Sequence, residues 1–228
     1  CVAAGIVIGI LGISGLGFNL TLALVQVGEG SLFLLLSLSA IVCVILGMGL
    51  PTVGVYVLLA ALVAPAMVKV GIEPIAAHLF VVYFGMMSMI TPPVAIAAFA
   101  AATLAKSDAM DTGWAAVRFG WMAYVVPFLF VLSPTLLLIG TPGHIFIAIV
   151  TAIMGVWLVS IAMVGFFMRA LSWPMRALFA ASGLLALVPA SAFPGAEYTD
   201  IVGAAVGILV IGYEFLAARA PAPSKSLP

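Results

Sequence analysis

The segments Gly47-Met48-Gly49-Leu50-Pro51-Thr52 and Thr91-Pro92-Pro93 decide the predicted fold, because each interrupts a long apolar stretch that carries no charge. Glycine permits a left-handed backbone, and proline lacks the amide hydrogen that a helix needs, so both segments end helices. An interrupted helix leaves roughly four N–H and four C=O groups without partners, and each costs several kcal/mol when it faces lipid. We therefore expect both segments to line a polar cavity within a membrane protein, as paired interruptions do at the binding sites of secondary transporters.

The composition indicates an all-α integral membrane protein. Of the 228 residues, 66% are hydrophobic and 6% are charged, and the mean hydropathy is +1.42. An ordinary soluble domain is about one-quarter charged. Several uncharged windows reach the roughly 20 residues that a spanning helix needs, and the alternation of an outer-membrane barrel is absent. The net charge is zero, which excludes a basic surface for nucleic acid, and Cys1 and Cys43 offer neither a disulfide framework nor a metal site.

Apolar stretches predict where the chain crosses the membrane. The predicted spans or half-spans are 2–27, 32–48, 53–68, 75–105 with the second interruption inside it, 121–139, 144–167, 175–193 and 201–216. The first residue, Cys1, enters an apolar stretch without a basic region ahead of it, so we interpret the sequence as a fragment.

Basic residues in the connections predict the orientation. Alternating spans place six of the seven on one side, namely Lys106, Arg118, Arg169, Arg176, Arg219 and Lys225. We assign this side to the cytoplasm, because short cytoplasmic loops carry the positive excess. The stretch 32–68 is either two full spans or a re-entrant hairpin, since both return the chain to the same face. The absence of charge between Gly47 and Tyr56 favours a hairpin tip inside the protein.

Neutral oxygen atoms are the predicted ion ligands. Between residues 31 and 105 the only charged side chains are Lys69 and Glu73, both in a surface connection. Carbonyl oxygens freed ahead of the prolines, together with Ser and Thr hydroxyls, suit a small hard cation such as sodium, and no other cofactor is predicted. His78 is open to two interpretations, a proton relay or a hydrogen-bonded structural histidine, and its place near a helix start favours the second.

Two other classes of function compete with transport. Gly12-Ile13-Ser14-Gly15 resembles the G-x-S-G tetrapeptide of rhomboid intramembrane proteases, in which the serine pairs with a histidine on another helix. Small residues at this spacing also serve close helix packing, and we predict no enzyme activity. A non-transporting membrane scaffold would instead have unbroken helices through Pro51 and Pro92.

Four motifs, in this order and spacing, resemble the large membrane subunit of TRAP transporters, and most of all the fused permease form. They are 47–52, Ala77-His78-Leu79-Phe80, Tyr83-Phe84-Gly85 and 88–95. The resemblance covers 1–140, which we assign to the transport domain. We assign 141–217 to additional transmembrane helices and 218–228 to a disordered tail.

The resemblance implies an elevator-type transporter built from two inverted repeats, each with a re-entrant hairpin and a discontinuous helix, of which this chain supplies the second. It implies sodium-driven uptake of organic anions, mostly carboxylates, across the bacterial inner membrane. The implied partners are a periplasmic solute-binding protein and a small membrane subunit or its fused upstream equivalent. The residues expected to bind the cation or the substrate are Gly47, Gly49, Thr52, Ser88 and Thr91, with Pro51, Pro92 and Pro93 holding the broken geometry.

Overall fold

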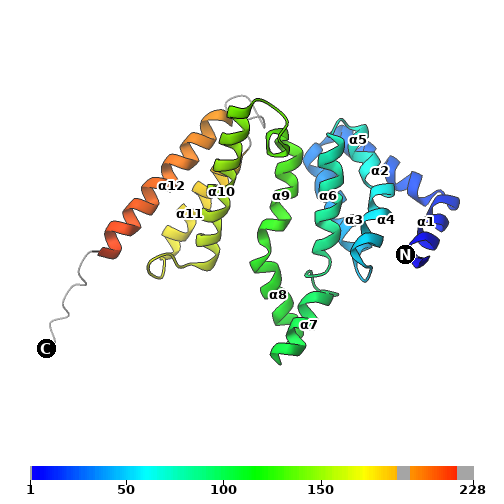
Figure 1. The fold of residues 1–228 in the computed structure, drawn as a ribbon, viewed down its shortest axis with the longest axis horizontal. Coiled ribbons are helices and arrows are strands. Elements are labelled where there is room, and N and C mark those ends of the chain that lie inside the picture. Colours follow the sequence, from blue (N-terminus) through cyan, green and yellow to red (C-terminus); the bar gives the residue numbers. More distant parts are fainter. Residues whose placement is uncertain (1, 189–195, 220–228) are drawn as a thin grey trace. The chain divides into compact units, whose positions relative to one another are not determined.

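The structure, a computed structural model, describes residues 2–188 and 196–219, and the chain divides into two compact units, 1–137 and 138–228 (Figure 1). The described residues form helices and no sheet; one isolated bridge joins Phe166 and Ala170. Within these described ranges, three helical segments are long and apolar enough to cross a membrane, or four if one bent pair is counted as a span. The prediction of an all-helical membrane protein is confirmed.

The first unit contains nine α-helices and a 3-10 helix among its described residues. They are α1 (Val2–Ile13), α2 (Leu16–Gly30), α3 (Leu32–Gly47), α4 (Thr52–Leu62), α5 (Ala64–Lys69), α6 (Pro74–Met87), α7 (Ile96–Ala105), α8 (Ala109–Phe119), α9 (Trp121–Leu132) and η1 (Pro134–Leu137). Side-chain caps begin two of them. The Ser31 hydroxyl accepts from the Leu34 amide at the start of α3, and the Asp108 carboxylate accepts from the Asp111 amide at the start of α8.

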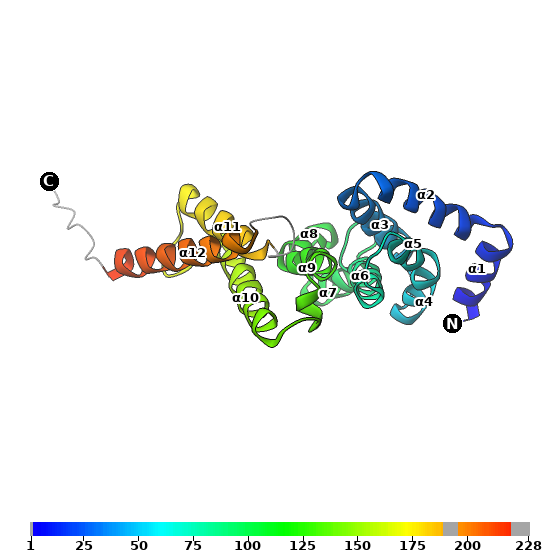
Figure 2. The same cartoon turned by 90° about the horizontal axis from the view of Figure 1, so that it is seen from above.

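Helix α6 lies at the centre of this unit and packs against α3, α4 and α9 (Figures 1 and 2). Gly85 allows the close approach to α4, since a Cβ atom built on it would lie 2.5 Å from Val55 Cγ1. On the α9 side, the Phe128 ring stands edge-on to Phe80 and Phe84, with centroids 5.5 and 5.6 Å apart. This apolar core fixes the end of α6, where the chain is interrupted.

The second unit is built from α10 (Pro142–Val164), α11 (Trp173–Leu187) and α12 (Ala196–Arg219), which pack against one another (Figure 2). Helices α10 and α11 cross where Gly155 meets Gly183. A Cβ atom on Gly155 would lie 2.8 Å from the Gly183 carbonyl oxygen, and one on Gly183 would lie 2.7 Å from the Gly155 carbonyl oxygen. Small residues at such crossings let helix backbones touch.

Several predicted boundaries differ from the structure. The stretch 2–27 is not one straight helix, because α1 and α2 meet at Ser14–Gly15 with a bend of 74°, and Gly15 has a φ of +69°. Of the predicted span 121–139, residues 121–132 form α9 and Pro134–Leu137 form η1. Helix α9 continues α8 in a 24-residue stretch from Ala109 to Leu132 that begins after the Asp108 cap. Residues 218 and 219 belong to α12, and the rest of the predicted tail, like 189–193, lies outside the described residues.

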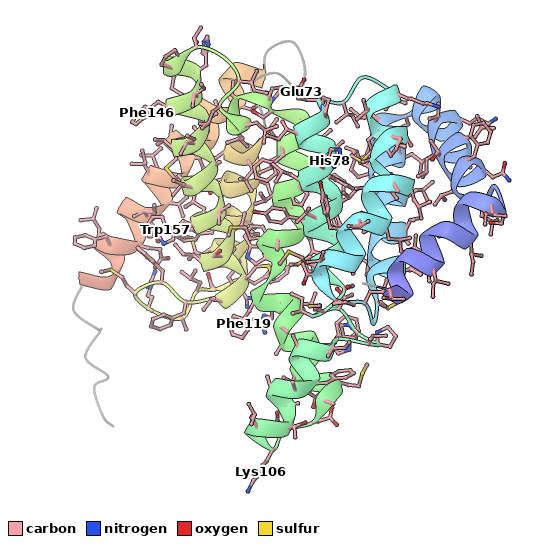
Figure 3. The ribbon with its side chains drawn as sticks, turned by 45° about the vertical axis from the view of Figure 1, so that its right-hand side comes forward. Glu73, His78, Lys106, Phe119, Phe146 and Trp157 are labelled. Carbon is pink, nitrogen blue, oxygen red and sulfur yellow. The ribbon has the colours of Figure 1, made fainter. Side chains whose placement is uncertain are left out.

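Figure 3 shows two of the charged residues that were used to predict the orientation of the first unit. Glu73, just before α6, and Lys106, just after α7, lie at opposite ends of this unit. The interruption between α6 and α7 therefore lies between two ends that carry charge.

Candidate ion- and substrate-binding site

The first interruption is a tight turn between α3 and α4. The Met48 amide donates to the Ile45 carbonyl at 3.3 Å, and the Leu50 amide donates to the Gly47 carbonyl at 3.4 Å. Gly49 has a φ of +80°, a left-handed conformation that glycine adopts without steric cost. Pro51, with a φ of −68°, stands just before the first turn of α4. Glycine and proline thus produce the predicted break.

The second interruption separates α6 from α7 by residues 88–95. The Met89 amide donates to Met86 O and the Ile90 amide to Met87 O, which tightens the end of α6, and the Ala97 amide then reaches back to Met89 O at 3.0 Å. None of the hydrogen bonds of the described residues in this break uses the carbonyl oxygens of Ser88 or Ile90. Both oxygens keep lone pairs available to a hard cation.

The two interruptions meet at Gly47. A Cβ atom built there would lie 2.8 Å from the Gly85 carbonyl oxygen and 3.0 Å from Ser88 Oγ. Ser88 is buried, and its hydroxyl donates to the same Gly85 carbonyl at 2.6 Å. The structure therefore brings together Gly47 and Ser88, which the sequence suggested separately, at the ends of α3 and α6.

Thr91 contacts a residue that sequence reasoning missed, Tyr124 of α9. The Thr91 hydroxyl donates to the Met87 carbonyl, and its Oγ1 lies 2.7 Å from the Tyr124 hydroxyl oxygen. The sequence held one signal for this contact. Gly113, Gly120 and Tyr124 are spaced by seven and four residues, which places them on one face of a helix.

The same face of α8 and α9 covers the second interruption. A Cβ atom on Gly120 would lie 2.8 Å from Ile90 Cδ1, and one on Gly113 would lie 3.0 Å from Pro92 Cγ. Ile90, Thr91 and Pro92 are therefore each contacted from this face.

The other predicted residues are more open. Gly49, Pro51, Thr52 and Pro93 are exposed, and a Cβ atom on Gly49 would meet nothing within 4 Å. No hydrogen bond among the described residues joins this turn to Ser88 or Thr91. The contact between the interruptions is thus made by Gly47 and not by the exposed part of the turn.

Comparison with known families decides the identity. The family described as the DctM component of the tripartite ATP-independent periplasmic (TRAP) transporter matches residues 1–145, which is more than half of the chain. This chain belongs to the DctM family. DctM is a multi-pass membrane protein of the bacterial inner membrane, and the TRAP system implies a periplasmic binding protein and a DctQ partner. No curated protein and no solved structure matches the chain significantly.

As a DctM component the chain is part of a transporter and not an enzyme, so the protease alternative is excluded. The structure gives Ser14 a local role instead. Its hydroxyl donates to the Leu11 carbonyl at 3.2 Å and accepts from the Leu16 amide at 3.4 Å, across the bend between α1 and α2. The scaffold alternative required unbroken helices, whereas this DctM chain is interrupted ahead of Pro51 and Pro92.

His78 of this DctM chain is held by Tyr56. Its Nδ1 lies 3.1 Å from the Tyr56 hydroxyl oxygen, and the two rings stand edge-on with centroids 6.0 Å apart. This geometry agrees with the interpretation of His78 as a hydrogen-bonded structural histidine. Among the described residues, no three His, Cys, Asp or Glu side chains are grouped as metal ligands.

Proposed function

We propose that this DctM chain is part of a sodium-driven importer of organic anions, mostly carboxylates. In this proposal α3 and α4 form a re-entrant hairpin, and α6 and α7 form a discontinuous helix, within the second inverted repeat of an elevator-type transporter. The observation that carries the proposal is the contact of the two interruptions, where Gly47 lies against Gly85 O and Ser88 Oγ. A bilayer tolerates such backbone only where it is buried in protein or lines a cavity.

The chemistry of this contact favours a cation. The C-terminal end of α6 carries about half a negative charge from its peptide dipoles. Around it lie the Ser88 and Thr91 hydroxyls and the carbonyl oxygens of Ser88 and Ile90, which the hydrogen bonds of the break leave available. Oxygen ligands without a carboxylate suit sodium better than a transition metal.

The carboxylate of the substrate needs donors rather than acceptors. The N-terminus of α4 offers amide groups and a partial positive charge, and Thr52 is its exposed first residue. Exposed Gly49 leaves space beside it. Cation and anion would then be held on opposite sides of the contact between the interruptions.

Transport measured in vesicles tests the coupling. The complete transporter would be reconstituted with its binding protein, and uptake of a panel of radiolabelled mono- and dicarboxylates would be followed. We expect uptake of at least one of them under an inward sodium gradient and much slower uptake when potassium replaces sodium. Equal uptake in both gradients would contradict sodium coupling.

Replacement of Thr91 tests the site. Thr91→Val keeps the shape of the side chain but removes its oxygen, so we expect the sodium concentration for half-maximal uptake to rise about tenfold, as for the loss of one interaction of about 1.4 kcal/mol. Thr103→Val is the matched control, because the Thr103 hydroxyl also donates to the carbonyl four residues earlier but is exposed on α7, away from the interruption. Unchanged sodium activation in Thr91→Val would remove Thr91 from the site.

A further inference from the structure

We propose that Tyr124 is a positioning residue that orients the Thr91 hydroxyl toward the coupling ion by donating a hydrogen bond to it from α9. This inference rests on the proposed function, since it assigns a role within the same ion site. It adds a residue that lies outside both interruptions and 33 positions from Thr91.

The direction of the hydrogen bond follows from the number of hydrogen atoms. A threonine hydroxyl carries one hydrogen and two lone pairs, and a carbonyl oxygen can only accept. Thr91 gives its hydrogen to Met87 O, so the hydrogen in the 2.7 Å contact must come from Tyr124. One lone pair of Thr91 Oγ1 accepts this hydrogen, and the second remains available to a cation.

The two bonds also limit rotation of the Thr91 side chain. One partner is Met87 O, within the end of α6, and the other is Tyr124 on a separate helix. Linked hydrogen bonds polarise and strengthen one another. With both bonds formed, the remaining lone pair has a defined direction, and less order has to be imposed when an ion binds.

Packing alone accounts for the ring of Tyr124 but not for its hydroxyl. The ring lies against Phe84 of α6, with centroids 6.5 Å apart. It also lines an open apolar cavity of about 250 Å³ with Ala40, Ile41, Val44, Ile45 and Phe84. A phenylalanine would make the same apolar contacts, whereas a half-buried hydroxyl is costly without a partner, and Thr91 is that partner.

The glycines of the same face make the bridge possible. Gly120 and Gly113 carry no side chains where α9 meets Ile90 and α8 meets Pro92, so the helix backbone lies close to the interruption. Tyr124, one turn beyond Gly120, then reaches Thr91.

Another tyrosine provides a matched control. Tyr83 of α6 packs edge-on against Phe130 of α9, with ring centroids 5.8 Å apart, so it bridges the same two helices. Among the described residues its hydroxyl makes no hydrogen bond. Replacing each tyrosine with phenylalanine removes one hydroxyl at the same helix interface, and only one of them contacts the interruption.

Binding of radioactive sodium to the purified complete transporter in lipid nanodiscs tests the proposal. We expect Tyr124→Phe to raise the half-saturating sodium concentration about three- to tenfold, which is the usual effect of one lost hydrogen bond, while Tyr83→Phe binds like the wild type. In a Thr91→Val background, Tyr124→Phe should cause no further change, because its acceptor is already gone.

The outcomes separate the inference from the proposed function. If the wild type binds sodium and Tyr124→Phe binds it equally well, the inference is wrong and the proposed function stands. If Tyr124→Phe lowers the melting temperature but leaves the half-saturating sodium concentration unchanged, the role of the Tyr124 hydroxyl is merely structural, and the inference is wrong in that case too. If the wild type itself binds no sodium, both the proposed function and the inference fail.

A second variant covers the case in which Tyr124→Phe does not fold. In Gly120→Leu the Cβ atom would lie 2.8 Å from Ile90 Cδ1 and three further carbon atoms would follow it, which is more than a shift of the Ile90 side chain can accommodate, so α9 must move away from the interruption. We expect the half-saturating sodium concentration to rise in this variant as well. An unchanged value would contradict the positioning role of the α9 face.

Discussion

Gly47 shows at the scale of a residue how the backbone builds the candidate site. It has no side chain, yet it is buried where α3 meets the end of α6, against Gly85 O, Ser88 Oγ and Val55 Cγ1. Two of these three neighbours are polar oxygens that an additional methyl group would displace. The identity of residue 47 therefore controls how closely the interruptions approach.

We expect Gly47→Ala to abolish most transport, because its Cβ atom would lie 2.8 Å from a backbone oxygen that cannot move away like a flexible side chain. Gly9→Ala, where a Cβ atom meets nothing within 4 Å, should transport normally. The transport activity of both variants is measured as carboxylate uptake, corrected for the amount of folded protein in the membrane. Wild-type uptake by Gly47→Ala would show that close approach is not needed.

Sequence reasoning at this scale found some residues of the candidate site and missed one. Gly47, Ser88 and Thr91 stand in or beside segments rich in glycine and proline, which are visible without any knowledge of partners. Tyr124 stands in an apolar helix with nothing polar beside it in the sequence, and only its spacing from Gly113 and Gly120 sets it apart. Its importance depends on a hydrogen bond across 33 residues, which only packing creates. The binding roles of the predicted residues stay predictions.

At the scale of an element, the crossing of α10 and α11 depends on a reciprocal contact of two glycines. Each residue of the pair, Gly155 and Gly183, would place an added Cβ atom within 3 Å of the carbonyl oxygen of the other. Neither helix can move aside freely, because α12 also packs against both. The three helices therefore hold one arrangement.

We expect Gly155→Ala to destabilise the second unit by about 1–3 kcal/mol, the usual cost of overpacking. Gly143→Ala, in the first turn of the same helix, meets nothing within 4 Å and should leave stability nearly unchanged. Heat- or denaturant-induced unfolding of the purified proteins in detergent compares the stability of the two variants. Equal stability of both variants would mean that α10 and α11 can separate at no cost.

Helix ends were harder to predict than helix existence. The break at Gly15 lies in an apolar stretch without proline or charge, so Ser14 and Gly15 were its only local sign, and the hydrophobic pattern continues through the 74° bend. The start of α8 at Ala109 was missed because Lys106, Asp108 and Asp111 suggested only a surface connection. Asp108 in fact caps the helix that follows it.

At the scale of the whole molecule, the chain divides into two units, and every predicted site residue lies in the first. The second unit contains an ion pair that sequence reasoning did not find. Arg169, between α10 and α11, contacts both carboxylate oxygens of Glu214 on α12, at 2.7 and 3.1 Å, and Glu214 is 1% exposed. The hydrogen bond with Glu214 raises the pKa of Arg169. The stability that this raised pKa contributes is therefore present at neutral pH and is lost as the pH rises through the pKa of Arg169.

We expect Arg169→Met to lower the melting temperature by several degrees, because the carboxylate of Glu214 would stay buried without its partner. The double variant Arg169→Met/Glu214→Leu should recover much of this loss, since no buried charge remains. The half-saturating sodium concentration should not change in either variant. A double variant less stable than Arg169→Met would contradict this expectation. It would show that the ion pair stabilises the unit by more than the free energy needed to bury its charges.

The sequence by itself determined the class of protein and the places where its helices are interrupted. These follow from composition and from glycine and proline, whose effects are local to the backbone that carries them. The tertiary structure decided which residues meet: Gly47 with Gly85 and Ser88, Tyr124 with Thr91, and Arg169 with Glu214. These contacts join residues far apart in the chain, and their partners are set by how the helices pack, which no local pattern records.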